Sequence, residues 1–305
     1  FTQSSTLGTT FDATSATHNL TGSGATQFGN VTINGSTTLN AGSHNFSVSG
    51  NWTRTGIFTP GTSTVTFNGT SQTLTGNTTF NNLTTNSGTL LDTGTSLITV
   101  NGTLANNGML RHTTPAQNVT NGSGTFSFLD AVSRTTAQLT QTGGANMGNT
   151  TLVVTAHIAP TNYACGSTTL GGQPVRRLFD LTPTNTTGVT ANLRLYFYDG
   201  AGGAGDEANG NTLSNIAIYH CNGTNWSRWG GTYTTGTDPT TGYRYVELPD
   251  VTEFSPFAIG GGPGAPTAVT LSDFSARAEE DYTKLAIVFS AAMLVVLAIA
   301  LVRRA

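Results

Sequence analysis

Along the first half of the chain, apolar residues stand singly or in pairs at strand spacing, and Thr, Asn, Ser and Gly fill the positions between them. The stretch FNNLTTNSGTLLDTGTSLITVNG, residues 80–102, shows the pattern and carries one formal charge, Asp92. Alternation of apolar and polar residues predicts short β-strands. Asn-Gly pairs at 34–35, 68–69, 101–102 and 121–122 predict tight turns, because both residues accept a positive φ angle.

The pattern recurs after 52 residues: FGNVTIN at Phe28 aligns with FNNLTTN at Phe80, and Leu39 aligns with Leu91. Short strands with this period predict a β-solenoid whose 52-residue unit forms two or three coils. A β-sandwich with long hairpins is the structural alternative. In the solenoid the inward-facing residues would be Phe28, Val31, Ile33, Leu39, Phe46, Val48, Phe80, Leu83, Leu91, Ile98 and Val100. Neutral Thr and Asn would line the outer faces, since like charges on rungs about 4.8 Å apart repel.

The segments FNNLTTNSGTLLDTGTSLITVNGTLANNG and GNWTRTGIFTPGTSTVTFNGTSQTLTG resemble the β-strand repeats of large prokaryotic cell-surface proteins, in the style of adhesin β-helices. The resemblance covers roughly residues 20–125. It implies an extended extracellular structural or adhesive element, and it brings no active site with it.

From about Asn149 the apolar alternation becomes longer, as in TTLVVTAHI, VRRLFDLTP, ANLRLYFYD and NIAIYHCNG, a texture typical of a β-sandwich. Residues 150–278 also resemble C-terminal sandwich modules of prokaryotic surface proteins, which implies a spacer or membrane-proximal module. We therefore predict an all-β protein with a single C-terminal transmembrane-type α-helix. Its parts are a β-solenoid at 1–140, a β-sandwich at 141–260, a linker at 261–283 and an apolar helix with a basic tail at 284–305.

The segment from Leu285 to Val302 has 18 residues and no charge, enough for a helix of roughly 27 Å that spans a bilayer. Arg303 and Arg304 follow it, which predicts a cytoplasmic tail and an extracellular remainder. The chain begins with Phe1 and no Met, as expected of a product whose signal peptide has been removed. The alternatives are a buried helix of a soluble core, or helices that bundle inside a polymer.

Charged residues make up only 9% of the chain, against about 25% in ordinary globular proteins. A net charge of −3 without a basic cluster argues against nucleic-acid binding. Cys165 and Cys221 are the two cysteines, and they can form one disulfide in an oxidising compartment or remain two buried thiols.

Three carboxylates in the loop DGAGGAGDEANGN, those of Asp199, Asp206 and Glu207, are candidate Ca²⁺ ligands, with a solvated turn as the alternative. No catalytic motif or cofactor signature is present, so we expect no catalytic residue and no cofactor. Paired carboxylates for polysaccharide cleavage would have to come from Asp12, Asp92 and Asp130, which lie tens of residues apart. Trp226, Trp229, Tyr233, Tyr243 and Tyr245 could stack on sugars or belong to the core.

Fifteen Asn-x-Ser/Thr sequons are possible glycosylation sites, and glycans would make an uncharged surface soluble. They are at Asn19, Asn30, Asn34, Asn45, Asn51, Asn68, Asn77, Asn82, Asn101, Asn118, Asn121, Asn149, Asn185, Asn222 and Asn225.

These observations together predict a non-enzymatic extracellular structural protein of the cell envelope. It would be membrane-anchored by its C-terminal helix or assembled through it as a homo-oligomer or as the subunit of a surface filament or sheath. A carbohydrate-binding adhesin is the alternative function, and a polysaccharide-degrading β-helix enzyme is a remote one.

Overall fold

The structure is a computed structural model, and it describes residues 8–12, 16–22, 24, 26–158, 163–166, 168–200, 206–254 and 256–261. These residues form strands and turns, with no helix among them, so none of the described segments could cross a membrane as a helix. The predicted apolar helix, Leu285 to Val302, lies outside the described residues. So does the predicted linker from residue 262 onward.

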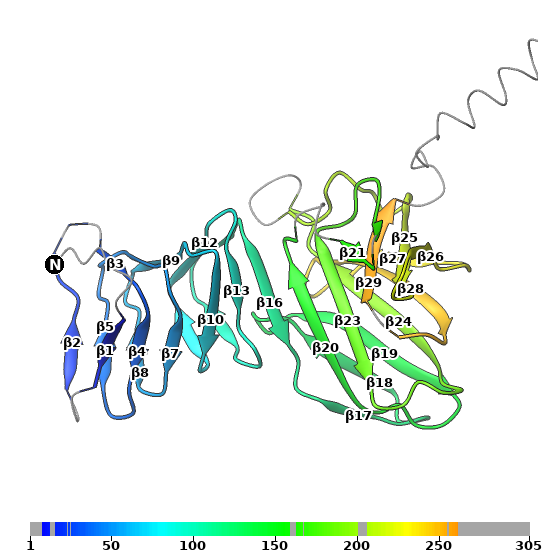
Figure 1. Cartoon of the computed structure of the whole chain (residues 1–305), viewed down its shortest axis with the longest axis horizontal. Coiled ribbons are helices and arrows are strands. Elements are labelled where there is room, and N and C mark those ends of the chain that lie inside the picture. The colour runs from blue at the N-terminus through cyan, green and yellow to red at the C-terminus, as the bar shows by residue number, and fades with distance from the viewer. Residues whose placement is uncertain are drawn as a thin grey trace, which may run out of the picture. The chain divides into compact units, whose positions relative to one another are not determined.

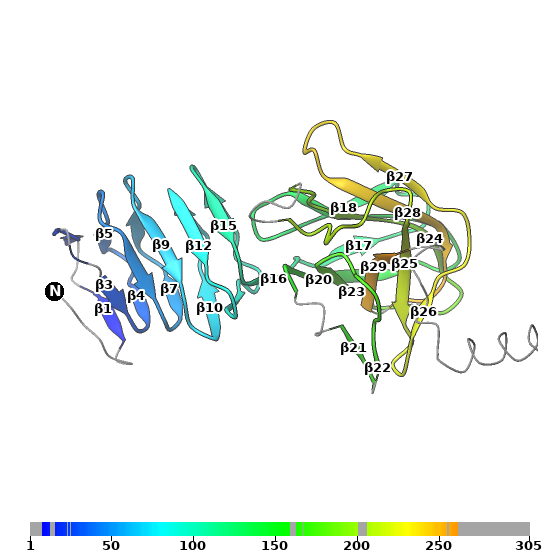
Figure 2. The same ribbon diagram turned by 90° about the horizontal axis from the view of Figure 1, so that it is seen from above.

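Strands β1 to β16 form a right-angled stack of coils in which every third strand adds to the same face (Figure 1). The first face contains β1 (Thr9–Phe11), β4 (Val31–Ile33), β7 (Trp52–Arg54), β10 (Ser71–Thr75), β13 (Leu90–Asp92) and β16 (Met109–Thr113). The second contains β2 (Thr17–Asn19), β5 (Thr38–Asn40) and β8 (Ile57–Thr59), followed by β11 (Thr78–Phe80) and β14 (Ile98–Val100). The third contains β3 (Thr26–Phe28), β6 (Phe46–Val48), β9 (Thr64–Phe67), β12 (Asn82–Thr85) and β15 (Leu104–Asn106), of which β9, β12 and β15 are seen in a row in Figure 2.

Neighbouring strands on a face are parallel, which confirms the predicted all-β class and N-terminal β-solenoid. Paired residues are separated by 18 positions for Thr64 and Asn82 and by 22 for Thr9 and Val31, so one coil takes about 20 residues. The 52-residue offset joins Phe28 at the end of β3 to Phe80 at the end of β11, eight strands later. With three strands per coil this is two and two-thirds coils, so residues related by 52 lie on neighbouring faces instead of one above the other.

The interior of the solenoid contains the apolar residues that the alternation predicted to face inward. All of them are buried except Val100, which is half-buried and packs against the same cluster. A line of rings runs through the coils, with Phe46 stacked on Trp52 at 6.4 Å and Trp52 edge-on to Phe58 at 5.0 Å. The buried Trp52 Nε1 donates a hydrogen bond of 3.2 Å to Thr78 Oγ1, so even its polar atom is satisfied inside the stack.

After β16 the pairing changes from parallel to antiparallel. Residues 117–261, here named the two-sheet region, form two sheets, the first continuing the face of β16. That sheet contains β20 (Gly148–Ala156), β23 (Arg177–Pro183), β29 (Pro256–Gly261), β25 (Ile216–Cys221) and β26 (Trp226–Arg228), with β17 (Gln117–Val119) beside β20. The second contains β18 (Thr125–Leu129), β19 (Thr135–Gly143), β24 (Thr190–Phe197), β28 (Arg244–Val251) and β27 (Thr234–Thr237). A short pair, β21 (Ala164–Cys165) and β22 (Thr168–Thr169), stands apart.

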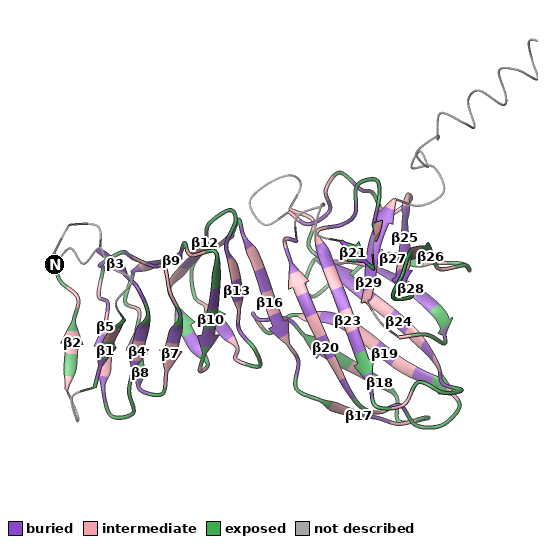
Figure 3. Cartoon of the chain, viewed as in Figure 1, coloured by how far each residue is buried: buried purple, intermediate pink, exposed green. Residues whose placement is uncertain are grey.

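One hydrophobic cluster includes residues from both sheets of the two-sheet region, such as Phe179 and Phe257 from the first and Leu193 and Val246 from the second. Buried and exposed positions alternate along these strands (Figure 3), as expected where only one face of a sheet packs inward. The predicted boundary between residues 140 and 141 falls inside β19, since the short strands before it already belong to the antiparallel pairing.

Candidate functional site

The last coil of the solenoid is covered by the two-sheet region. On the first face, β16 pairs with β20, and Ala156 of β20 belongs to the solenoid core cluster. On the second face, the turn at residues 130–134 between β18 and β19 takes the place of another rung. There the Ile98 N–H donates to the Ala131 carbonyl at 2.7 Å, and Ala131 is buried in the same cluster. Two of the three faces therefore end on partners, and the solenoid core is closed at this end.

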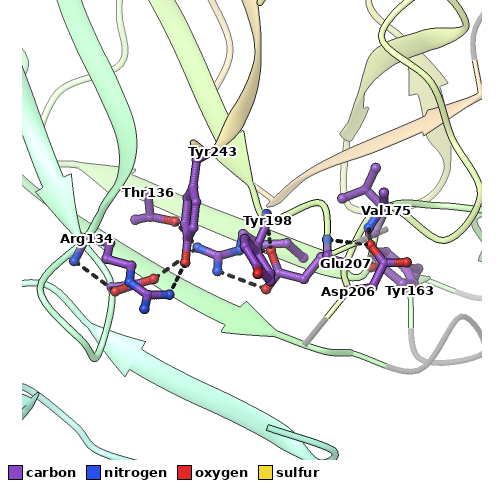
Figure 4. Close-up of polar contacts among 12 residues, drawn as sticks. Arg134, Thr136, Tyr163, Val175, Tyr198, Asp206, Glu207 and Tyr243 are labelled. Atoms are coloured by element: carbon purple, nitrogen blue, oxygen red, sulfur yellow. Dashed lines mark hydrogen bonds and ion pairs between the residues drawn. The ribbon is translucent and has the colours of Figure 1, made fainter. Parts of the chain in front are cut away.

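A buried ion network holds this capping turn. Arg177 on β23 donates from Nε and Nη2 to the two carboxylate oxygens of Glu207, both at 2.8 Å. Its Nη1 donates to Thr136 Oγ1 at 2.7 Å and lies 3.5 Å from Asp130 Oδ2 (Figure 4). Burial alone would lower the pKa of Arg177, but Glu207 and Asp130 raise it above its ordinary value, so the guanidinium stays charged.

Asp130 and Tyr243 extend this network. Asp130 Oδ1 accepts hydrogen bonds from the backbone N–H groups of Val132 and Arg134, which fixes the turn. The Arg134 guanidinium donates to the Tyr243 hydroxyl at 2.7 Å (Figure 4). Burial raises the pKa of Tyr243, which keeps the phenol protonated. Two carboxylates and two guanidinium groups therefore balance one another.

A cavity of about 670 Å³ lies between this network and the last coil. Leu104 and Leu110 of the solenoid line one side, and Asp130, Arg177 and Tyr243 line another. Its volume is within the range of small-molecule pockets, roughly 300–1,000 Å³. The arrangement can therefore offer a ligand an apolar wall and a polar wall at once.

His112 on β16 also lines the cavity and is 1% exposed. Its Nδ1 lies 2.8 Å from Thr93 Oγ1, whereas its Nε2 has no hydrogen-bond partner among the described residues. Desolvation lowers the pKa of His112, and Asp130 and Asp92 oppose that effect only in part, so the ring is neutral at neutral pH.

Two backbone positions of the cavity wall are in the left-handed region. Ser133 at the tip of the capping turn has φ 63°, and His157 just after β20 has φ 57°. Positive φ is uncommon for residues other than glycine and tends to gather at functional sites. The described residues include only two others, Asn209 and Asp250.

The three predicted Ca²⁺ ligands contact protein groups in the structure. Asp199 forms an ion pair with Arg244, and Asp206 Oδ1 accepts from the N–H groups of Gly200 and Ala208 at 3.1 Å. Glu207 turns inward to Arg177. No group of three or more His, Cys, Asp or Glu side chains in the described part of the chain is placed to hold a metal ion. Calcium binding stays a prediction.

The carboxylates considered for polysaccharide cleavage are also individually engaged. Asp12 is exposed, Asp92 is paired with Arg111 on the outside of the first face, and Asp130 is paired with Arg177. Asp92 and Asp130 both lie near enough to His112 to affect its pKa, a proximity that the sequence does not indicate.

The tryptophans that could stack on sugars pack against the protein. The Trp226 Nε1 donates to the Tyr163 carbonyl at 2.8 Å, and the Trp229 ring lies 5.3 Å from the His220 ring. Tyr198, which the sequence reasoning did not select, is 36% exposed and lines the cavity, with its ring centroid 5.5 Å from that of Tyr243.

Thirteen of the fifteen sequon asparagines are exposed, and Asn82 and Asn185 are half-buried. Several have a structural role: the side-chain carbonyl accepts the backbone N–H of the next coil. Asn30 accepts from Asn51 at 2.7 Å, and Asn51 in turn accepts from Thr73 at 2.9 Å. Asn45, Asn77 and Asn82 make the same contact at 2.7, 2.9 and 2.8 Å. This capping gives the abundance of Asn a reason independent of glycans.

Cys165 of β21 and Cys221 of β25 form a disulfide with an S–S distance of 2.00 Å, across 56 residues of sequence. It fastens the short β21–β22 pair to the first sheet of the two-sheet region.

No protein-family model, no curated protein and no solved structure matches this chain, so the assignment of function rests on its own residues and geometry.

Proposed function

We propose that the chain is a non-enzymatic structural protein of the extracellular cell surface. The single observation that carries the proposal is the solenoid itself: stacked coils with an apolar interior and outer faces built largely from neutral Thr, Asn and Ser. Such a scaffold grows by adding coils and needs no special site to be stable. In this proposal the two-sheet region is a β-sandwich that caps the scaffold and separates it from the membrane.

The disulfide supports an extracellular location, because disulfides form and persist in oxidising compartments and are rare in the cytosol. The apolar segment from Leu285 to Val302 supplies the attachment, either as a single membrane anchor or as a helix that bundles with its copies inside a filament or sheath.

The capped end of the solenoid narrows how copies could assemble. Since β16 and β14 end on the two-sheet region, two solenoids cannot stack head to tail through these faces. At the other end, β2 and β3 are terminal strands of their sheets among the described residues. A contact between two such ends is isologous and closes a dimer. A filament therefore requires that the two-sheet region or the C-terminal segment of one copy contacts the first coil of the next.

Electron microscopy of native material tests this proposal. A surface polymer predicts regular filaments or sheets after mild extraction, and a membrane tether predicts single particles attached to membrane. Deletion of residues 285–302 separates the two modes, since a tether is then secreted as a folded monomer whereas a polymer loses assembly. Recovery of the intact chain as an intracellular soluble protein with reduced cysteines would refute the cell-surface assignment altogether.

A further inference from the structure

The cavity at the capped end of the solenoid combines features that a scaffold does not need. Two residues in the left-handed region, Ser133 and His157, form part of its wall, and the buried His112 leaves Nε2 without a partner among the described residues. Each feature costs about 1–3 kcal/mol of folding free energy. Their concentration at one cavity points to a ligand.

The charges around the cavity indicate a neutral ligand. Asp130 and Glu207 face Arg134 and Arg177, and these four groups are paired within the protein. An ionic ligand would have no unbalanced charge to meet, and it would lose its hydration on entering.

The groups that remain available suit a hydroxyl-rich ligand. Tyr243 receives a hydrogen bond from Arg134 and has its own hydroxyl proton to donate. His112 is neutral, so its Nε2 either donates or accepts, according to the tautomer. A hydroxyl group both donates and accepts, and it therefore pairs with Nε2 in either case.

The apolar groups complete the match. Leu104 and Leu110 form the opposite wall, and Tyr198 exposes its ring beside Tyr243. A sugar ring has an apolar C–H face and a rim of hydroxyl groups, so it can pack on the leucines or on a tyrosine ring while its rim reaches His112 and Tyr243.

We propose that this cavity is a binding site for a neutral sugar ring, held between the end of the solenoid core and the Tyr198–Tyr243 pair. The site lies away from Trp226 and Trp229, and it does not depend on the proposed structural function, since a scaffold, a tether or a filament subunit could equally carry it.

Titration of the full chain with glucose, galactose, mannose and N-acetylglucosamine tests the proposal, with saturation-transfer NMR and calorimetry as readouts in a sugar-free buffer. We expect at least one of these sugars to bind with a dissociation constant in the millimolar range or below, detectable at about 50 mM sugar. Tyr198→Ala, at an exposed position, should weaken binding about three- to tenfold through lost stacking. Tyr243→Phe should weaken it by a similar factor through one lost hydrogen bond.

Tyr245→Phe is the matched control, because Tyr245 lies on the same stretch of chain as Tyr243 but does not line the cavity. It should leave the affinity unchanged, as should Trp226→Ala. The proposal is overturned if none of the four sugars binds and the cavity holds only water, or if binding survives Tyr198→Ala and Tyr243→Phe but is lost with Trp226→Ala. Filament images cannot rescue or refute this site, so the two proposals fail independently.

Discussion

Replacement of Arg177 by Met tests how the capped end of the solenoid is held. The substitution keeps most of the aliphatic volume and removes the cation between Glu207 and Asp130. The side chains of these two acids are only 2% and 8% exposed, so neither can recover its hydration without local opening. The perturbation therefore leaves two carboxylates buried beside a hole where their shared partner was.

Removal of one partner of a buried ion pair destabilises a protein by about 3–5 kcal/mol. A loss of this size lowers the melting temperature by about 6–20 °C, at the 2–4 °C per kcal/mol typical of a domain of 150–250 residues. Urea unfolding followed by circular dichroism measures the free energy, and thermal unfolding measures the shift. Because Asp130 fixes the turn that covers Ile98, we also expect faster amide exchange at Ile98 in the variant.

Arg194→Met is the matched control. Arg194 forms a comparable pair with Glu247, but these side chains are 31% and 26% exposed, and the expected loss is below about 1 kcal/mol. Adding Glu207→Gln to Arg177→Met removes one of the orphaned charges and should recover part of the stability. The reasoning is refuted if Arg177→Met costs no more than Arg194→Met, or if Glu207→Gln is as harmful in the Arg177→Met background as in the native protein.

Three further predictions concern the coils and the cavity. Asn51→Ala should destabilise the solenoid by about 1 kcal/mol, because its side-chain carbonyl accepts the N–H of the next coil, whereas Asn68→Ala at an exposed turn should change stability by less than about 0.5 kcal/mol; equal losses in urea unfolding would contradict the capping role. Burial lowers the pKa of His112 below its ordinary 6.5, so the unfolded chain takes up the proton more readily and stability falls as the pH drops through 6.5; the urea midpoint of His112→Phe should depend less on pH there, and an unchanged slope would contradict the assignment. Gly42→Ala should cost about 1–2 kcal/mol for its left-handed backbone alone, whereas Gly61→Ala should cost more, because its methyl group would overlap the Gly42 carbonyl of the preceding coil; equal costs would show that the coils do not approach so closely.

Much of the solenoid is readable from local sequence. The side chains of a strand alternate between its two faces, so apolar residues at every second position identify the core before any partner is known. Phe28, Leu39, Leu83 and Ile98 were assigned to the interior in this way, and each is buried. The register is different. A repeat of 52 residues shows that the strand-and-turn unit recurs, but it does not reveal that three units close one coil.

The candidate site depends on pairings that local patterns do not encode. Arg177 meets Glu207 across 30 residues and Asp130 across 47, and His112 reaches the same cavity from the last coil. In the sequence, Glu207 belongs to an acidic loop that favours a solvated turn or calcium. Only the packing of the two-sheet region against the coil shows that it turns inward to a buried arginine.

By itself, the sequence determined that the chain forms short strands, which side chains face inward, and that the outer surface is nearly free of charge, because these properties follow from the two-residue period of a strand and from the conformations open to Gly and Asn. The tertiary structure decided the length of a coil, the closure of one solenoid end, and the cavity with its balanced charges. These depend on which distant segments become neighbours, and a buried charge can be interpreted only once its partner is known.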